Sequence, residues 1–339
     1  MEVVQFKKLI KEHKSANHSV FDKIEDLVLK DELTKEQYYL FAVNIATRTM
    51  MSLPEIHACC IQASLDLDPL RTTYSVMTGA EEGGSGNPKE VHSVLMMNAL
   101  NYHGKVVYQM EPINLKYLMS LTRLVYYSQK LFCFYKLEAK YNGIGNDLIS
   151  CSFINIDEIK EICIRMAKKS TIEANFDSLK EVKKAEEIAF NKLIQHGVLK
   201  ETIDYCLEQM AVLINMKTGY LQGVGFAHEA LADGMIDKMF RILYPQVNKY
   251  NNYNDFIENV YPYFSAHGNY LEVYNGASEE AEGVEVTHAL REIEKLNQLD
   301  KEALKTAWIG ANNFANRNVK IWDSMMDVLV KSQQLNYSL

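Results

Sequence analysis

The chain has 339 residues, of which 47% are hydrophobic and 24% charged, and its formal net charge at pH 7 is −8. This composition is typical of a folded globular protein and excludes a mostly disordered chain. The acidic balance argues against an extended nucleic-acid groove, and no apolar run approaches the ~20 residues of a membrane span. With only 6 prolines and 16 glycines, the chain has too few turn residues for a fold built of many short strands, so we expect an all-α fold.

Predicted helices follow one another along nearly the whole chain. Residues 1–31 are expected to form two short amphipathic helices around Ser15–Ser19, without the apolar core of a signal peptide, so we expect a cytoplasmic protein. Residues 1–33 are predicted to be an N-terminal helical extension, and residues 34–339 one helical domain. Further helices are predicted over 34–50, 52–65, 69–80, 90–99, 113–141, 154–170, 178–196, 199–217, 222–243, 254–274, 284–297 and 300–332.

Several local signals mark where helices begin or break. The sequence from Ser52 to Glu55 matches a capping box with a proline in the first turn, which predicts a helix that starts there. The glycine-rich stretch 81–88 interrupts the pattern, as do the turn at 141–147 and the acidic stretch 275–283.

Some ionisable residues stand where the helical period calls for apolar ones. His92 shares a face with Leu95, Met96 and Ala99, and Glu82 lies ten residues earlier, at the end of the preceding helix. Taken alone, His92 is most simply a core histidine with ordinary hydrogen bonds. The glycine-rich turn, however, would let the two side chains converge, and a buried charge needs a partner or a metal.

The middle of the chain offers two further carboxylates. Glu229 lies on an apolar face of the 222–243 helix and needs a partner there, whereas His228 should point about 100° away and be a neighbour rather than a co-ligand. Glu55 needs no further role if it only completes a capping box with Ser52.

The last third of the chain carries two histidines of interest. His267 lies in the aromatic sequence YPYFSAH, where a structural hydrogen-bonding role is the simpler explanation. Glu285 and His288 form a Glu-x-x-His pair one turn apart, a spacing that lets a carboxylate and an imidazole bind one metal or bridge two.

Taken in order, these residues resemble the haem-oxygenase-like diiron oxidase and oxygenase family, a helical family related to TenA and to the pyrroloquinoline-quinone synthesis protein. The resemblance rests on RTTYSVMTGAEEGGSGNPKEVHSVL from Arg71 to Leu95, on the lone Glu229, and on the aromatic residues before His267; Glu55 stands at a suitable distance for the family's first glutamate. It covers roughly residues 35–300.

The resemblance implies a haem-oxygenase-like helical bundle with terminal helical extensions. It also implies an O2-dependent oxidase or oxygenase that uses Fe(II), with two ions expected, on a small organic substrate such as an amino acid or a fatty acid. The metal ligands it implies are Glu55, Glu82, His92, Glu229, His267, Glu285 and His288.

One departure from the family pattern concerns the last motif, which is normally His-x-x-x-Asp-x-x-His on one unbroken helix. Here Leu271 and Tyr274 occupy the later positions, so the carboxylate and second histidine would come from Glu285 and His288, with Glu272 as a competing carboxylate. The sequence therefore leaves open whether the protein binds one metal ion, two metal ions or none.

Other classes also remain open. A ferritin-like diiron protein would show two Glu-x-x-His motifs, and a haem oxygenase would need a proximal histidine such as His13 or His18. A metal-free TenA-like enzyme would use the same pocket for acid–base chemistry, and a non-enzymatic helical binding protein would use its buried histidines structurally. The expected partner is a small-molecule substrate, with no nucleic acid and no membrane; a homodimer is one alternative for the oligomeric state.

Overall fold

The computed structural model describes residues 3–141, 156–215, 219–275 and 284–336. These residues form α-helices and short 3-10 helices with no strand among them, which confirms the expected all-α class. Most of the predicted turn at 141–147 and most of the predicted interruption at 275–283 lie outside the described residues. None of the described helices is both long enough and apolar enough to cross a membrane.

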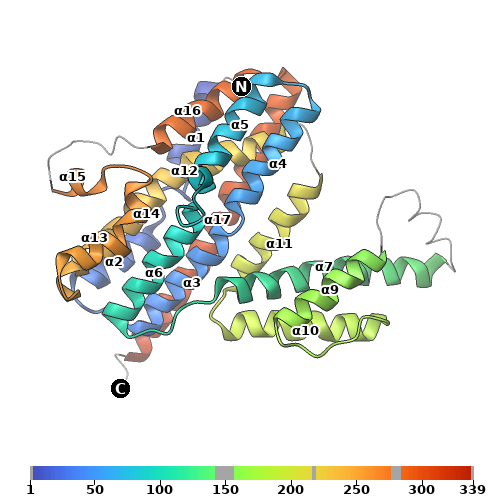
Figure 1. Ribbon diagram of the computed structural model, residues 1–339, viewed down its shortest axis with the longest axis horizontal. Coiled ribbons are helices and arrows are strands. Elements are labelled where there is room, and N and C mark those ends of the chain that lie inside the picture. Colours follow the sequence, from blue (N-terminus) through green and yellow to red (C-terminus); the bar gives the residue numbers. More distant parts are fainter. Residues whose placement is uncertain (1–2, 142–155, 216–218, 276–283, 337–339) are drawn as a thin grey trace. The chain divides into compact units, whose positions relative to one another are not determined.

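The chain divides into two compact units. One unit is continuous and spans Asn114–Met210, while the other combines Met1–Ile113 with Ala211–Leu339. In the continuous unit, α7 (Leu115–Tyr141) packs against both α9 (Ile156–Lys169) and α10 (Leu179–Gln195) (Figure 1). The domain division predicted at residue 33 is a different one and stays a prediction.

The discontinuous unit holds every site residue discussed below. Its first part contains α1 (Val3–Glu12), α2 (Ser19–Leu29), α3 (Lys35–Thr49), α4 (Ser52–Leu65), α5 (Pro69–Glu82), the 3-10 turn η1 (Gly84–Gly86) and α6 (His92–Tyr108). Its second part contains α12 (Tyr220–Leu243), the 3-10 turn η2 (Tyr244–Lys249), α13 (Tyr253–Asn259), α14 (Tyr261–Ser265), α15 (Tyr270–Tyr274), α16 (Val284–Asn297) and α17 (Lys301–Asn336). The C-terminal end of α11 (Lys200–Asn215) also falls here.

Helix α12 is the centre of this unit, since it contacts α1, α2, α4, α16 and α17 (Figure 1). Its packing on α17 is very close at Gly223, because a Cβ atom there would overlap the backbone of Ala307. A side chain of any size at this position would push the two helices apart. Helix α12 is thus held on several sides, and its polar pair His228 and Glu229 is buried among its neighbours.

The segment predicted as helical over 254–274 is three short helices rather than one. Pro262 stands in the first turn of α14, where its missing N–H is tolerated, so the helix restarts there instead of continuing from α13. His267 follows α14 in the link before α15, and it is 4% exposed. The break allows His267 to point at a helix other than its own.

The predicted capping box at the start of α4 is wrong. The N-cap is Met51, no side chain caps this end, and the Glu55 amide donates to the Met51 carbonyl as in the body of a helix. The Glu55 carboxylate therefore does not cap the helix. The residue lies in the interior and is 1% exposed. The Ser52 hydroxyl, also buried, makes no hydrogen bond to the described residues.

Candidate metal centre

The turn between α5 and α6 brings Glu82 and His92 together. Gly84 adopts a φ of 78°, and a Cβ atom there would lie 2.7 Å from the Val91 amide nitrogen. Only glycine allows the chain to double back so tightly. As a result Glu82, the last residue of α5, and His92, the first of α6, lie side by side, with 2.9 Å between Glu82 Oε1 and His92 Nδ1.

The contact between these two side chains is not an ordinary hydrogen bond. His92 Nδ1 is buried and makes no hydrogen bond to the described residues, although Glu82 Oε1 is 2.9 Å away. At that separation only an unfavourable angle prevents a hydrogen bond. The two atoms are thus as close as an ion pair, without the alignment of a hydrogen bond.

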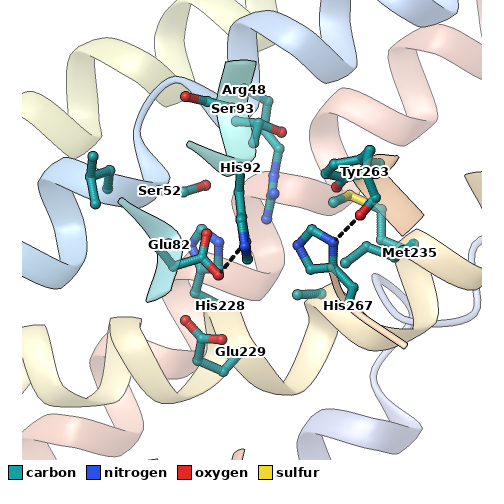
Figure 2. A pocket seen from close by; sticks show the side chains of 14 residues that line it. Arg48, Ser52, Glu82, His92, Ser93, His228, Glu229, Met235, Tyr263 and His267 are labelled. Atoms are coloured by element: carbon teal, nitrogen blue, oxygen red, sulfur yellow. Dashed lines mark hydrogen bonds and ion pairs between the residues drawn. The ribbon is translucent and has the colours of Figure 1, made fainter. Parts of the chain in front are cut away.

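His267 completes this group from the opposite side. Its Nδ1 donates to the Tyr263 carbonyl oxygen at 2.6 Å, which fixes the tautomer and leaves the lone pair on Nε2. Figure 2 shows the ring facing His92, with 4.3 Å between the two ring centroids. Burial, with the neighbouring His92, lowers the pKa of His267 to about 4, so the imidazole is neutral at pH 7.

One ligand atom from each of Glu82, His92 and His267 lies within 4.8 Å of the other two. A first-row metal ion about 2.1 Å from each ligand holds ligand atoms roughly 3–4.2 Å apart, so a pair of ligand atoms at the 4.8 Å limit would have to approach by about 0.6 Å or more to bind one ion. A neutral imidazole with its other nitrogen held by a carbonyl is the usual state of a metal-binding histidine.

A second group of carboxylates and one histidine adjoins the first. His288, on α16, is fully buried; its Nδ1 lies 3.2 Å from Glu229 Oε2 and 3.8 Å from Glu82 Oε1, and its Nε2 lies 2.7 Å from Glu81 Oε2. Glu82 therefore stands between His92 and His288. Three regions that are remote in the sequence, residues 82–92, His267 and His288, therefore meet around this carboxylate.

Charge balance explains how so many ionised groups are buried together. Glu81 and Glu82 end α5, where the helix dipole disfavours negative charge, so they require cationic neighbours. Arg291 donates two hydrogen bonds to Glu81 and holds its pKa below the usual range. Burial alone would make His288 neutral, but the hydrogen bonds to Glu229 and Glu81 outweigh it and raise its pKa to about 9.

Glu229 stays ionised for the same reason. Burial opposes its charge, yet the hydrogen bond from His288 and the charge of His228 outweigh it and lower its pKa to about 2. On the same helix, His228 Nδ1 lies 2.7 Å from Glu55 Oε2, and that carboxylate raises the pKa of His228 against the effect of burial. His228 is thus a neighbour of Glu229 that pairs with Glu55 and is not among the three grouped side chains of Glu82, His92 and His267.

A buried ion pair lies further along α16. Lys295, 1% exposed, pairs with Glu292, whose other partner is the Gln222 amide at 2.7 Å; Lys295 also lies 3.3 Å from Ser75 Oγ. His288, Glu292 and Lys295 follow at intervals of four and three, so α16 presents one polar face to α5 and α12.

A small pocket opens onto the group of Glu82, His92 and His267. It offers about 30 Å³ to the centres of water molecules, room for two or three waters. Figure 2 shows Arg48 and Ser52 directed into it beside His92. The rest of its wall includes Leu53, Thr49, Ser93, Ala232, Met235, Ile236 and Tyr263.

The structure thus brings close together most of the residues that the resemblance implies as metal ligands. Glu82, His92 and His267 form one group, Glu229 and His288 adjoin it, and Glu55 reaches the cluster through His228. Glu285 belongs to the first turn of α16, but its side chain lies outside the described ones. The competing Glu272 is exposed and hydrogen-bonds to Asn269, so it takes no part in the described cluster.

Sequence reasoning did not select several residues of this site, namely Arg48, Ser52, Glu81, His228, Glu292 and Lys295. A signal existed for three of them: Glu81 is adjacent to Glu82, and Glu292 and Lys295 share the helical face of His288. No local pattern marks Arg48, since only tertiary contacts turn it toward the pocket.

The chain matches no protein-family model, no curated protein and no solved structure.

Proposed function

We propose that this protein is a non-haem iron oxidase or oxygenase that uses O2 to oxidise a small organic substrate. The observation that carries the proposal is the convergence of Glu82, His92 and His267, with a buried imidazole nitrogen that has no hydrogen bond among the described residues. Two histidines and one carboxylate are the donor set typical of non-haem Fe(II) oxygenases. The resemblance to the haem-oxygenase-like family agrees with this reading.

Each described residue has a definite task in this proposal. The Tyr263 carbonyl holds the tautomer of His267, and Gly84 allows the turn that sets His92 beside Glu82. Glu229 and His288, which adjoin Glu82, are the groups for a second ion, and binding there would displace the proton that His288 now carries. Bound iron would supply the O2 and one-electron chemistry that side chains lack.

The decisive experiment compares two buried histidines. Anaerobic Fe(II) titration of the purified protein should show saturable uptake, with O2 consumption when oxygen is admitted. His92→Gln should lose the uptake, because it removes one of three donors. His103→Gln is the matched control: His103 is also buried but hydrogen-bonds to Tyr250 and Gln246, so its loss should lower stability and leave iron uptake unchanged.

A metal-free acid–base enzyme is the second candidate, favoured by one specific observation. Both nitrogens of His288 already have carboxylate partners, so this histidine is charged and stabilised without any ion. If the native protein takes up no iron, and His92→Gln has the same stability as the native protein, these results would favour this candidate over the oxidase.

A further inference from the structure

We propose that a cleft on α6, outside the candidate metal centre, binds a neutral polyhydroxylated ligand of the monosaccharide class. The cleft lies where α6 packs against α13 and α14, and it offers about 350 Å³ to the centres of water molecules. Small-molecule sites in proteins span roughly 300–1,000 Å³, so the cleft is large enough for one small molecule. It shares no lining residue with the pocket at Glu82, His92 and His267, so this proposal is independent of iron.

One wall of the cleft is a single face of α6. Its residues Leu95, Asn98, Tyr102 and Lys105 follow one another at intervals of three, four and three, which places their side chains on one side of the helix. Asn98 and Lys105 are exposed, and neither side chain makes a hydrogen bond or ion pair with the described residues. Their amide and ammonium groups are therefore available to a ligand.

The opposite wall is formed by the end of α13 and the start of α14. Asn259 Nδ2 donates to the Asp255 carbonyl oxygen at 2.9 Å, which orients the amide and leaves its Oδ1 as an acceptor. Glu258 beside it is exposed, and within the described part of the chain its carboxylate has no hydrogen bond or ion pair. Pro262 adds an apolar surface in the first turn of α14. This wall thus offers two acceptors beside an apolar surface.

Asn101 holds the third side of the cleft in place. Its Oδ1 accepts from the Ile113 amide at 2.8 Å, and its Nδ2 donates to the Ile113 carbonyl oxygen at 3.3 Å. These two hydrogen bonds tie the segment after α6 back to the helix and keep Pro112 in the wall. A wall that is fixed before the ligand arrives lowers the entropic cost of binding.

The charges of the lining favour a neutral ligand. Among the lining residues that the structure describes, Lys105 and Glu258 are the charged ones, and their opposite charges cancel. Burial and the carboxylates of Asp255 and Glu258 raise the pKa of Tyr102, so the phenol keeps its proton at pH 7 and lies within electrostatic reach of the opposite wall. A ligand with a net charge would meet one group of its own sign in this cleft.

The mixture of polar groups matches the hydroxyls of a sugar. Each hydroxyl both donates and accepts hydrogen bonds, so a sugar site must present donors and acceptors side by side. The cleft does so with two carboxamides, a phenol, a carboxylate and an ammonium group, which belong to Asn98, Asn259, Tyr102, Glu258 and Lys105. The C–H faces of a pyranose ring can pack on Leu95, Pro112 and Pro262. A wholly apolar ligand would instead leave the polar groups without partners.

The test is saturation-transfer-difference NMR on the purified protein, with methyl α-D-glucopyranoside, methyl α-D-mannopyranoside and methyl β-D-galactopyranoside as probes. At least one glycoside should show saturable binding, and its affinity should change less than about twofold between about 0.05 and about 0.5 M salt, because salt does not screen a neutral ligand. Glu258→Ala should weaken this binding at least about tenfold and Asn98→Ala about fivefold, since each variant loses a hydrogen bond to the ligand. Asn254→Ala, at an exposed position of α13 outside the cleft, is the matched control and should bind like the native protein.

Glycine, choline and propionamide are measured beside the glycosides, as a zwitterion, a cation and a neutral molecule without hydroxyl groups. Absence of saturable binding for all three glycosides would refute the proposal, and so would tighter binding of glycine, choline or propionamide. Equal affinities in Glu258→Ala and Asn254→Ala would show that the sugar binds elsewhere and would overturn it too. None of these outcomes depends on iron, so a failure here leaves the proposed function untouched.

Discussion

Replacing Gly84 by alanine tests whether the tight turn after α5 builds the metal centre. The added Cβ would lie 2.7 Å from the Val91 amide nitrogen, and relief to an ordinary contact of 3.4 Å requires a shift of about 0.7 Å. His92 follows Val91 directly, so it must move by a similar amount relative to Glu82. A binding site tolerates only about 0.5 Å of such displacement.

Gly86 provides a matched control in the same turn. Its φ is 95°, so alanine is strained there too, but no atom lies within 4 Å of the added Cβ. Both variants should therefore lose about 1–2 kcal/mol of unfolding free energy from the left-handed backbone. Gly84→Ala should lose more, about 3 kcal/mol in all, because its backbone contact adds to the strain.

Iron binding should separate the two variants more sharply than stability does. In an anaerobic Fe(II) titration, the iron affinity of Gly84→Ala should be at least about tenfold lower than that of the native protein, because disturbing the groups that support a metal ligand usually has an effect of this size. The iron affinity of Gly86→Ala should stay within about twofold of native. Urea unfolding gives the stabilities. Equal iron affinity in the two variants would refute the claim that this contact positions His92.

Three further outcomes are expected from the buried groups. Burial lowers the pKa of His103 to about 3, whereas the pKa of this histidine in the unfolded chain is near 6.5, so the unfolded state takes up a proton first as the pH falls. The contribution of His103 to the unfolding free energy should therefore fall by about 1.4 kcal/mol from pH 7.5 to 5.5. This fall should be absent in His103→Gln. Glu55→Gln removes the carboxylate that pairs with the buried His228 and should cost about 3 kcal/mol of unfolding free energy in urea, whereas no loss would show that the pair is dispensable. Gly223→Ala should cost at least about 2 kcal/mol, because the methyl group would overlap the Ala307 backbone; a folded variant with native melting temperature would contradict the close packing of α12 on α17.

Local patterns determined much of the architecture of this protein. Apolar periodicity and breaker residues predicted the all-α class, and most of the helices lie within a few residues of their expected bounds, α16 with the same bounds. The sequence also indicated that Glu82 and His92 converge, because a glycine-rich turn within ten residues allows the chain to reverse its direction between them. These features depend on interactions between residues close in the chain.

Only the tertiary structure decided which remote groups meet. Glu55 matched a capping box, yet packing of α4 on α12 directs its carboxylate to His228, and the helix starts without it. Likewise no periodicity indicates that α16 sets His288 against Glu82, or that the break after α14 turns His267 toward His92. A sequence pattern gives the face of a helix that a residue occupies, whereas the neighbour on that face depends on how the helices pack, which is a property of the whole unit.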